Sequence, residues 1–511
     1  MQGETNAQSL IVTGHTRLTR FRAGTIAFWR SRPAAALYLS CLRTEMAGLD
    51  EHYILPSHAS LRSTDPLGIC DDENPTVWEV ITVSIRSFRT EGKNIHQLPF
   101  VIQDLSYSIK SNGHLDTQCL SQFLVGRYPD PCSEDACKTL DAILDAALSL
   151  PTLFPSCTIP FLGKTHPKLR LSSSQIACLL AHEILDTLFP PKGNTWGSTF
   201  TCWFSEPQAL PDAVLGYLES LFNFFTLRNI DDIEIIYHYS DQSFRGVDRE
   251  LESWLDCSDV RPFGNLILAP VSTGSVPYPH PQIPCTLIAS NQSPGFGPAC
   301  TQEELVTAAC PPLLPLGALL ISPPVPPNAI IIAQGYVPLA HWKGQGREAH
   351  PVGTSVTAHH TFLFLDAAEL DSNTETLPDL NDVYLFRDLH KAHTGFSALD
   401  ALGVKEIASP IWGAGSFGGD PFVKTLILSA AAARTGMTIH LAVDEERFIS
   451  TPNSSEKLIL LDVLRNVKHT NKGLTVAEVV RRLQVKDGGK CEDTVELVHL
   501  FGTRNNQSEF V

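Results

Sequence analysis

The first candidate site joins two glycines to three polar side chains that directly precede a helical pattern. Gly295 and Gly297 leave the backbone open to close approach by a ligand. Gln302, Glu303 and Glu304 follow, so that an amide and two adjacent carboxylates stand where a helix begins. Backbone N–H groups at a helix start bind anionic oxygens, and a carboxyl group beside such an oxygen can protonate a leaving group. The pattern therefore indicates acid–base chemistry on an anionic ligand.

A structural explanation of the same residues is a capping box, with Thr301 at the N-cap and Glu304 three residues later. A helix N-terminus stabilises the ionised form of a carboxyl group, whereas a general acid must hold its proton near neutral pH. Burial or a bound phosphate would have to raise the pKa of Glu304 before it could act as an acid. Both interpretations stay open at this point.

A second glycine-rich segment stands between an apolar run at 407–411 and a helical pattern at 421–434. Asp420 is suited to cap that helix at its start, and Gly436 is suited to end it. An apolar run at 437–443 comes next. The order predicts a strand, a glycine loop, a helix and a second strand.

This second loop matches the GxGxxG pattern of dinucleotide-binding folds at Gly413, Gly415 and Gly418, with Asp444 as the acid that would bind a ribose. Too little chain follows for a full dinucleotide-binding domain, so that an NAD-dependent oxidoreductase is a weaker alternative. A loop that serves packing alone is another. Two glycine loops at helix starts could together bind a diphosphate.

The composition is that of a globular protein with two or three domains: 511 residues, of which 43% are hydrophobic and 18% charged. The net charge of −17 disfavours non-specific binding to nucleic acid or anionic membranes. No apolar run reaches the roughly 18 residues of a membrane span. The 13 cysteines include no CxxC pair, and no cluster has metal-ligand spacing. We therefore expect free thiols in a reducing compartment, no metal and no cofactor, and we interpret His182, Glu183, His359 and His360 as structural or solvent-facing.

Residues 1–45 differ from the rest, because their six arginines outnumber the two acids, Glu4 and Glu45. This is the composition of a transit peptide. The alternatives are a disordered leader, or an upstream start with Met46 as the working initiator.

Residues 46–228 are predicted to form a mainly helical accessory domain, with a loop-rich start that contains one hydrophobic alternation at 77–85. Helical patterns cover residues 133–150, a stretch capped by Ser173 and Ser174, and residues 212–227. From residue 229 to 450, short apolar runs bounded by Pro, Gly or Asp alternate with helical patterns at 382–393 and 421–434. These runs, predicted to be strands, are at 233–239, 265–269, 286–289, 318–321, 329–333, 361–365 and 437–443. Strands that alternate with helices predict an α/β layer structure. Residues 451–511 are predicted to be a helical extension, with a capping box at Thr475 and Glu478.

The two glycine segments, in this order and with these neighbours, resemble the poly(ADP-ribose) glycohydrolase family, and a fungal member of it. Gln302-Glu303-Glu304 matches the family's catalytic Gln-Glu-Glu, and residues 412–420 match its Trp-Gly-x-Gly-x-Phe-Gly-Gly-Asp in full. Residues 389–396 look like the segment upstream of that motif. Residues 159–162 and 175–181 look like the start of the family's helical domain, so that the resemblance covers about 155–445.

The resemblance implies an α/β fold: a macrodomain-like mixed sheet flanked by helices, with the N-terminal helical accessory domain packed on it. It implies hydrolysis of the ribose–ribose O-glycosidic bonds of poly(ADP-ribose), with release of ADP-ribose. Glu304 would be the general acid and base, Glu303 would hold ribose hydroxyls, and Gln302 would orient the pair. Adjacent carboxylates cannot flank one sugar from opposite faces, so this is not the usual glycosidase geometry.

The resemblance also implies the substrate-binding residues. Phe417 would pack on the distal ribose, and Gly415, Ser416 and Gly418 would offer their backbone to the diphosphate. Tyr336 would be the ring near the adenine or ribose, unless it is an ordinary residue at a strand end.

Several positions depart from the family pattern. Its three consecutive glycines are reduced to Gly295-Phe296-Gly297, and of its Asp-Phe-Ala-Asn only Asn291 survives. Ile411 replaces an asparagine, and Val443 replaces an aromatic that helps to hold adenine. Both glutamates remain, which favours a divergent but active hydrolase over a module that binds ADP-ribose without cleaving it. The expected partners are poly(ADP-ribose) and ADP-ribosylated proteins, and we expect a monomer in the nucleus or cytoplasm that binds neither nucleic acid nor membranes directly. A mitochondrial location would follow if residues 1–45 are a transit peptide.

Overall fold

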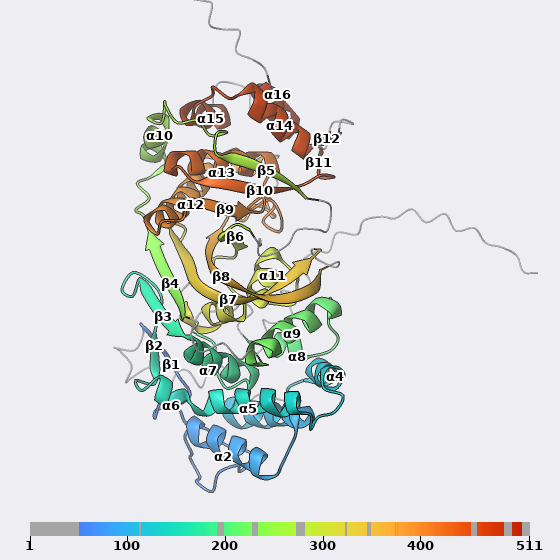
Figure 1. The fold of residues 1–511 in the computed structure, drawn as a ribbon. Helices are drawn as coiled ribbons and strands as arrows, with labels where there is room; N and C mark the ends of the chain where they lie inside the picture. Colours follow the sequence, from blue (N-terminus) through green and yellow to red (C-terminus); the bar gives the residue numbers. More distant parts are fainter. Residues whose placement is uncertain are drawn as a thin grey trace, which may run out of the picture. The chain divides into compact units, whose positions relative to one another are not determined.

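The computed structural model describes residues 51–111, 114–191, 199–226, 234–271, 282–321, 324–344, 349–373, 375, 377–450, 457–484 and 493–502 (Figure 1). Met1–Asp50 and Glu51–Val511 are separate units, and the described residues all belong to the second. The predicted leader, 1–45, lies outside the described residues.

The N-terminal part of the described chain is mainly helical, as predicted. Its helices are α2 (Val77–Thr90), α3 (Leu98–Lys110), α4 (Gln118–Arg127), α5 (Glu134–Leu148), α6 (Leu150–Leu153), α7 (Ser173–Ile184), α8 (Thr201–Phe204) and α9 (Pro211–Thr226). The helices predicted at 133–150, from Ser173 and at 212–227 correspond to α5, α7 and α9. The N-cap of α7 is Ser172, one residue earlier than predicted, because its side chain accepts the Gln175 N–H in a capping box.

The hydrophobic alternation at 77–85 does not form a strand, because these residues form the first part of α2. Thr76 and Glu79 make a reciprocal capping box that starts the helix. Val80, Ile81 and Ile85 lie on its buried face at helical spacing. The cap, rather than the apparent alternation, decides the local structure.

Within the described residues, eight strands form a mixed sheet, which confirms the predicted fold class. They are β3 (Lys168–Ser172), β4 (Glu234–Asp241), β5 (Leu266–Val271), β6 (Cys285–Ser290), β7 (Ala329–Lys343), β8 (His350–Asp366), β9 (Glu406–Ser409) and β10 (Thr438–Asp444). Their order is β3-β4-β7-β8-β6-β9-β10-β5. The first four strands in this order pair antiparallel, and β8, β6, β9, β10 and β5 pair parallel. Two short strand pairs lie outside this sheet: β1 (His52–Ile54) with β2 (Thr158–Pro160), and β11 (Phe448–Ser450) with β12 (Lys457–Ile459).

The strand predicted at 318–321 is wrong. Most of it belongs to a π-helical segment, η5 (Leu316–Leu320), that follows a short 3₁₀ turn, η4 (Pro311–Leu313). The residues of η4 and η5 are buried. A short run without polar positions cannot be assigned to a strand or a buried helix by periodicity, and the prolines before it favour helical φ values.

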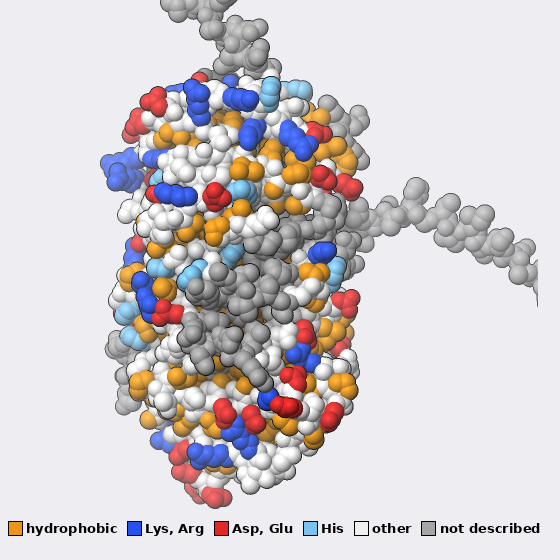
Figure 2. Space-filling model, viewed as in Figure 1, with side chains coloured by type: hydrophobic (Ala, Val, Ile, Leu, Met, Phe, Trp, Pro, Cys, Tyr) orange, Lys and Arg blue, Asp and Glu red, His pale blue; other side chains and the backbone are white. Residues whose placement is uncertain are grey.

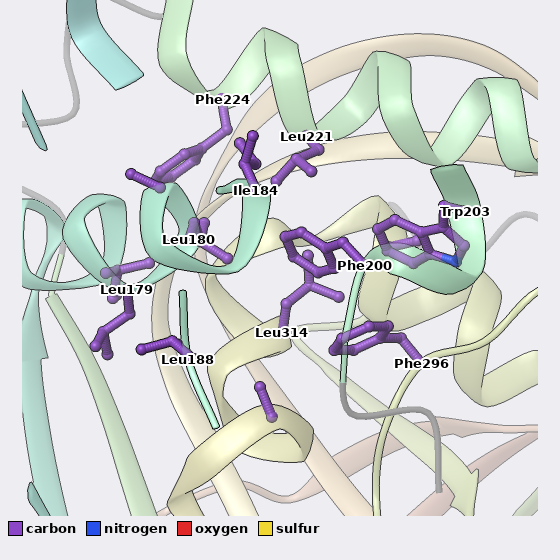
Figure 3. Packing of buried hydrophobic residues seen from close by; sticks show 14 of the residues in the cluster. Leu179, Leu180, Ile184, Leu188, Phe200, Trp203, Leu221, Phe224, Phe296 and Leu314 are labelled. Atoms are coloured by element: carbon purple, nitrogen blue, oxygen red, sulfur yellow. The ribbon is translucent and has the colours of Figure 1, made fainter. Parts of the chain in front are cut away.

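Both faces of the sheet are buried, which explains the continuous apolar runs in β7 and β8. Ile331 and Phe364 belong to one hydrophobic cluster, whereas their neighbours Ile330 and Leu365 belong to another. The first cluster also contains residues of α7, α8, α9 and α11 (Gln302–Ala309). Figure 3 shows part of this cluster at close range, with labelled side chains from α7, α8 and α9. The second contains residues of α10 (Val247–Leu255), α12 (Asp382–Ala401) and α13 (Pro421–Thr435).

The C-terminal helices α14 (Leu460–Thr470), α15 (Val476–Leu483) and α16 (Thr494–Gly502) share the second cluster with the sheet. The capping box predicted at Thr475 and Glu478 is present at the start of α15. The predicted domain limits at 228 and 450 stay predictions. One strand from before the first limit, β3, pairs with β4 at the edge of the sheet.

Candidate active site

The two glycine loops leave the sheet at the same end of its strands, the carboxyl end of the parallel half. In the parallel half of the sheet, β6 leads through residues 291–301 into α11, and β9 leads through residues 410–420 into α13. Both loops therefore follow the carboxyl ends of parallel strands, where α/β sheets bind ligands. The second loop also contacts the end of β8: the Trp412 Nε1–H donates to the Leu365 carbonyl at 3.0 Å.

Glu304 completes the capping box that the sequence left as an alternative. The Thr301 hydroxyl accepts the Glu304 N–H at 3.2 Å, and Oε2 of Glu304 accepts the Thr301 N–H at 2.9 Å. Glu304 is 2% exposed. Its carboxyl group therefore ends the first turn of α11 and has almost no contact with solvent.

Burial is the largest influence on the pKa of Glu304 and raises it, against the lowering effect of the N–H groups of Thr301 and Ala299. The condition that the sequence set for an acid at this position is thus met by burial. Gly297 contributes to it, because a β-carbon at 297 would overlap the Glu304 carboxylate. The Glu304 carboxyl group occupies the space that a side chain at position 297 would need.

Glu303 binds the backbone of the first loop with both carboxylate oxygens. Oε2 accepts the Asn291 N–H at 2.9 Å, and Oε1 accepts the Gly295 N–H at 3.0 Å. Burial raises the pKa of Glu303 to about 8, and the nearby Glu304 and Asp366 carboxylates act in the same direction. Glu303 therefore supports the loop. Its oxygens accept backbone N–H groups, whereas the resemblance implied that they bind ribose hydroxyls.

The two glutamates face different neighbours. Glu303 bonds to the loop that follows β6, whereas Glu304 lies near α8, where its charge is the second cause, after burial, of the raised pKa of Cys202. Consecutive helical residues are separated by about 100° around the axis, which explains the divergence. Gln302 bonds to β6 itself: its side chain accepts the Ala289 N–H at 2.8 Å and donates to the Leu287 carbonyl at 3.0 Å. This geometry suits the orienting role implied for Gln302.

Phe296, the residue that interrupts the glycines, is turned into the helical part of the chain. Its ring packs against both Phe200 and Trp203, with centroids 5.0 Å and 5.1 Å away, and is fully buried (Figure 3). The Trp203 Nε1–H donates to the Gly297 carbonyl at 3.2 Å. Sequence reasoning missed Phe200, the N-cap of α8, and Trp203 within it, because an aromatic pair at a one-turn helix carries no motif.

The first loop is consequently packed rather than open. Gly295 and Gly297 are both buried, and the Gly295 N–H is used by Glu303. Asn291 is half-buried, and its side chain accepts the Ser293 N–H at 3.0 Å. A diphosphate contact from Gly295 would have to replace the bond to Glu303.

The second loop is the more accessible of the two. Gly415, Ser416 and Gly418 are exposed, and Phe417 is half-buried with its carbonyl accepting the Leu370 N–H at 2.8 Å. Gly418 has φ 72°, a left-handed conformation that favours glycine. The loop therefore exposes the backbone of the three residues that the resemblance implied for the diphosphate.

Asp420 caps α13 as predicted, because its side chain accepts the N–H groups of Phe422 and Val423, each at 2.9 Å. Val443, at the position of the family's aromatic, is fully buried, so this strand position presents no ring to a bound adenine. Tyr336 lies in β7, and its side chain falls outside the described residues.

No group of three or more His, Cys, Asp or Glu that could hold a metal occurs among the described residues. Within the same residues, no single helix is long and apolar enough to cross a membrane. One pair, α11 with Pro311–Leu320, passes that test only together and is bent by 111°.

Two family models match the chain. The model described as poly(ADP-ribose) glycohydrolase, helical domain, matches residues 136–240. The model described as poly(ADP-ribose) glycohydrolase, Macro domain fold, matches residues 290–448. The second match contains both glycine loops and all three residues of the Gln-Glu-Glu segment, and its span includes the GxGxxG residues.

Among solved structures, the chain is similar to poly(ADP-ribose) glycohydrolase from Deinococcus radiodurans in complex with ADP-ribose, with 14% identity and a TM-score of 0.27 over 41% of this chain and 88% of the other. A point mutant of that protein, also in complex with ADP-ribose, matches with 13% identity and a TM-score of 0.24 over the same shares. No curated protein sequence matches this chain significantly.

Proposed function

The chain belongs to the poly(ADP-ribose) glycohydrolase family, and from this premise we propose that Glu304 is the general acid and base with which it cleaves its substrate. The family is one of glycosidases, so the chain is a hydrolase that acts on the ribose–ribose bonds of poly(ADP-ribose). The match of the macro-domain model to residues 413–418 replaces the dinucleotide-binding interpretation of that loop.

One observation carries the proposal: Glu304 is a buried carboxyl group whose raised pKa coexists with backbone donors aimed at its charged form. Burial raises the pKa of Glu304 and so favours its protonated form. The N–H groups of Thr301 and Ala299 then stabilise the carboxylate that remains after the proton has left. A group with both properties can give up a proton and take one back in the same catalytic cycle.

The reaction follows from these two states. Protonated Glu304 gives its proton to the bridging oxygen as the bond between that oxygen and the anomeric carbon breaks. The carboxylate then takes a proton from the water that attacks the oxocarbenium-like carbon, so that the acid is restored and ADP-ribose leaves. Because Glu304 is 2% exposed, the residues that cover it must move aside when the polymer binds.

Replacement of Glu304 tests the assignment. In Glu304→Gln, release of ADP-ribose from the polymer should be abolished, while the affinity for ADP-ribose stays within about tenfold, or about 1.4 kcal/mol. Unchanged turnover would remove Glu304 from the mechanism.

A module that binds ADP-ribose without cleaving it is the second candidate, and the capping box favours it. A glutamate that only closes its own helical turn needs no role in chemistry. Thr301→Val separates the two cases, because it removes the side-chain half of the box. If Glu304 is only structural, the wild type should show no turnover, and Thr301→Val should do no more than lower the unfolding free energy by about 1 kcal/mol. A catalytic Glu304 predicts a change in the pH profile of kcat as well.

We further propose that ADP-ribosylated proteins are the partners of this chain. We propose that it acts as a monomer, in the nucleus or cytoplasm, in the response to DNA damage. If residues 1–45 are a transit peptide, they direct a mitochondrial form. The interspersed acidic and basic side chains on the face in Figure 2, and the net charge of −17, support the absence of direct nucleic-acid or membrane binding. Fractionation of cells that express the full chain tests the location, and sedimentation tests the monomer.

A further inference from the structure

Six charged side chains lie together beneath the second glycine loop, five of them buried and Arg387 partly exposed. Three are acids and three are bases, so the group is neutral; we call it the ion cluster. It consists of Asp366, Asp379, Asp388, Arg387, Lys391 and Lys424. Lys391, Lys424, Asp379 and Asp388 expose no more than 1% of their side chains.

The members alternate in sign along a continuous path. Lys424 Nζ lies 2.8 Å from Asp379 Oδ1 and also pairs with Asp388. Arg387 pairs with Asp388 Oδ1 at 2.6 Å and with Asp366, and Lys391 pairs with Asp366 as well. A neutral cluster of mostly buried charges does not attract a diphosphate by its charge. Its role must lie in what it holds.

One end of the ion cluster supports the second loop. The Lys424 side chain passes directly under two of its glycines: a β-carbon at Gly413 would lie 3.1 Å from Lys424 Cε, and one at Gly419 would overlap it. Asp379 Oδ2 accepts the Asp420 N–H at 2.7 Å. The Gly419 N–H donates to the Gly413 carbonyl at 3.0 Å and closes the loop around the lysine.

The other end lies beside the first site. Asp366 ends β8, where it is paired in register with Ser290 of β6. The next residue along β6 is Asn291, whose N–H binds Glu303. Asp366 is also close enough to Glu303 for its charge to raise the pKa of that glutamate, after burial and the Glu304 charge. The cluster thus extends from the second loop to the strand ends that hold Glu303.

Buried ion pairs contribute little net stability, because desolvation of the charges offsets their attraction, but they can specify one arrangement of the groups they join. For Lys424, burial alone would lower the pKa, yet the Asp388 and Asp379 carboxylates outweigh it and the pKa lies above its ordinary value. The lysine therefore stays charged and bonded to both acids.

We propose that Lys424 is a positioning residue that holds the second glycine loop in the conformation that receives the diphosphate of ADP-ribose. The ion cluster transmits this position to the strand ends beside Glu303. The inference rests on the proposed function for its ligand, since the diphosphate is the group that the loop would bind.

Two variants of the full chain test the role of Lys424. Lys424→Met keeps an unbranched stem under the glycines and removes the charge, which leaves Asp379 without its cation and Asp388 with Arg387 alone. Lys424→Met combined with Asp379→Asn leaves two acids and two bases in the ion cluster, so that neutrality is restored. Lys405→Met is the matched control, because Lys405 forms an exposed ion pair with Asp400 at the surface.

The measurements are the Kd for ADP-ribose by calorimetry, KM and kcat with poly(ADP-ribose), and the unfolding midpoint. We expect Lys424→Met to raise Kd and KM at least tenfold with a smaller effect on kcat. The double variant should recover most of the lost stability and keep the raised Kd. Lys405→Met should match the wild type throughout.

A double variant with both stability and affinity of the wild type would overturn the proposal, because the lysine would then serve stability alone. If neither variant can be recovered folded, Lys424→Arg decides: a folded variant with Kd and KM raised above those of the wild type supports positioning by the length and shape of the lysine, and wild-type Kd and KM contradict it. A wild type that binds ADP-ribose but releases none from the polymer would refute the proposed hydrolysis, while the Kd values would still decide the role of Lys424.

Discussion

Gly297 and the carboxyl group of Glu304 adjoin so closely that a β-carbon at position 297 would overlap Glu304 Oε1. The glycine is required here for space rather than for a left-handed conformation, since it is not among the residues with positive φ. The first loop and the start of α11 therefore form one packing unit. The absence of a side chain at 297 leaves the space in which the Glu304 carboxyl group is buried, and burial raises its pKa.

Gly297→Ala should displace the Glu304 carboxyl group. We expect kcat to fall at least about 100-fold, which corresponds to about 2.7 kcal/mol, with the unfolding free energy lower by about 1–3 kcal/mol from overpacking. Steady-state kinetics and denaturant unfolding measure the two effects. Gly163→Ala is the matched control, because nothing lies within 4 Å of a β-carbon there. Full activity in the first variant would show that the carboxyl position does not matter for turnover.

Glu303→Gln should lower the affinity for ADP-ribose more than Glu304→Gln does. A carboxylate accepts the N–H groups of both Asn291 and Gly295, whereas an amide has only one oxygen and would face the other N–H with its own donor. The first loop should therefore lose its shape. Calorimetry should show more than a tenfold rise in Kd for Glu303→Gln, and equal losses in the two variants would argue against this division of roles.

The stability of the protein should fall as pH rises from about 4.5 to 8. Burial raises the pKa of Glu303 to about 8, so that in this window the folded chain keeps a proton that the unfolded chain has lost. The stabilisation is complete below the unfolded pKa and is lost as pH rises through the folded pKa. One such group changes the unfolding free energy by about 1.4 kcal/mol per pH unit.

Unfolding by denaturant across this window checks the prediction, with Glu303→Gln expected to reduce the slope. Glu183, whose pKa burial also raises to about 8, leaves a slope of the same sign in the variant. Glu183→Gln is therefore the control for a buried glutamate outside the site. A steeper fall in Glu303→Gln than in the wild type would contradict the assignment.

Trp203→Phe should loosen the first loop by removing one hydrogen bond. The Gly297 carbonyl would lose the indole N–H as its donor, which we expect to cost about 1–2 kcal/mol and to reduce kcat. Trp254→Phe is matched to it, because Trp254 is also fully buried but its indole nitrogen has no hydrogen-bond partner among the described atoms. Thermal unfolding and turnover of the two variants should differ. Equal losses would mean that the hydrogen bond contributes nothing beyond ring packing.

Chelation should leave the rate unchanged. The mechanism above routes both proton transfers through Glu304 and gives a metal no step, so that EDTA at millimolar concentration is not expected to inhibit release of ADP-ribose. Comparison of initial rates before and after exhaustive dialysis against EDTA measures this. A loss of activity that is restored by one divalent cation would require a different mechanism.

Much of the local structure could be predicted from the sequence, because caps, prolines and glycines act within a few residues. The helix at Asp420 to Gly436 begins and ends where its terminal residues indicated. The π-helical segment at Leu316–Leu320 could not be predicted in the same way. An apolar run carries no periodic signal once every side of it is buried, and its neighbours in space decide its conformation.

In the candidate site, too, some features depend on residues close in the chain and others on residues far apart in it. The sequence by itself determined which residues stand at the start of α11 and in the second loop, and it set the condition that burial must raise the pKa of Glu304. Only the tertiary structure decided that this condition is met, that Phe296 turns into the helical part, and that a buried ion cluster lies under Gly413 and Gly419. Desolvation and packing depend on residues far apart in the chain, such as Trp203 and Gly297, and no spacing rule within one segment contains that information.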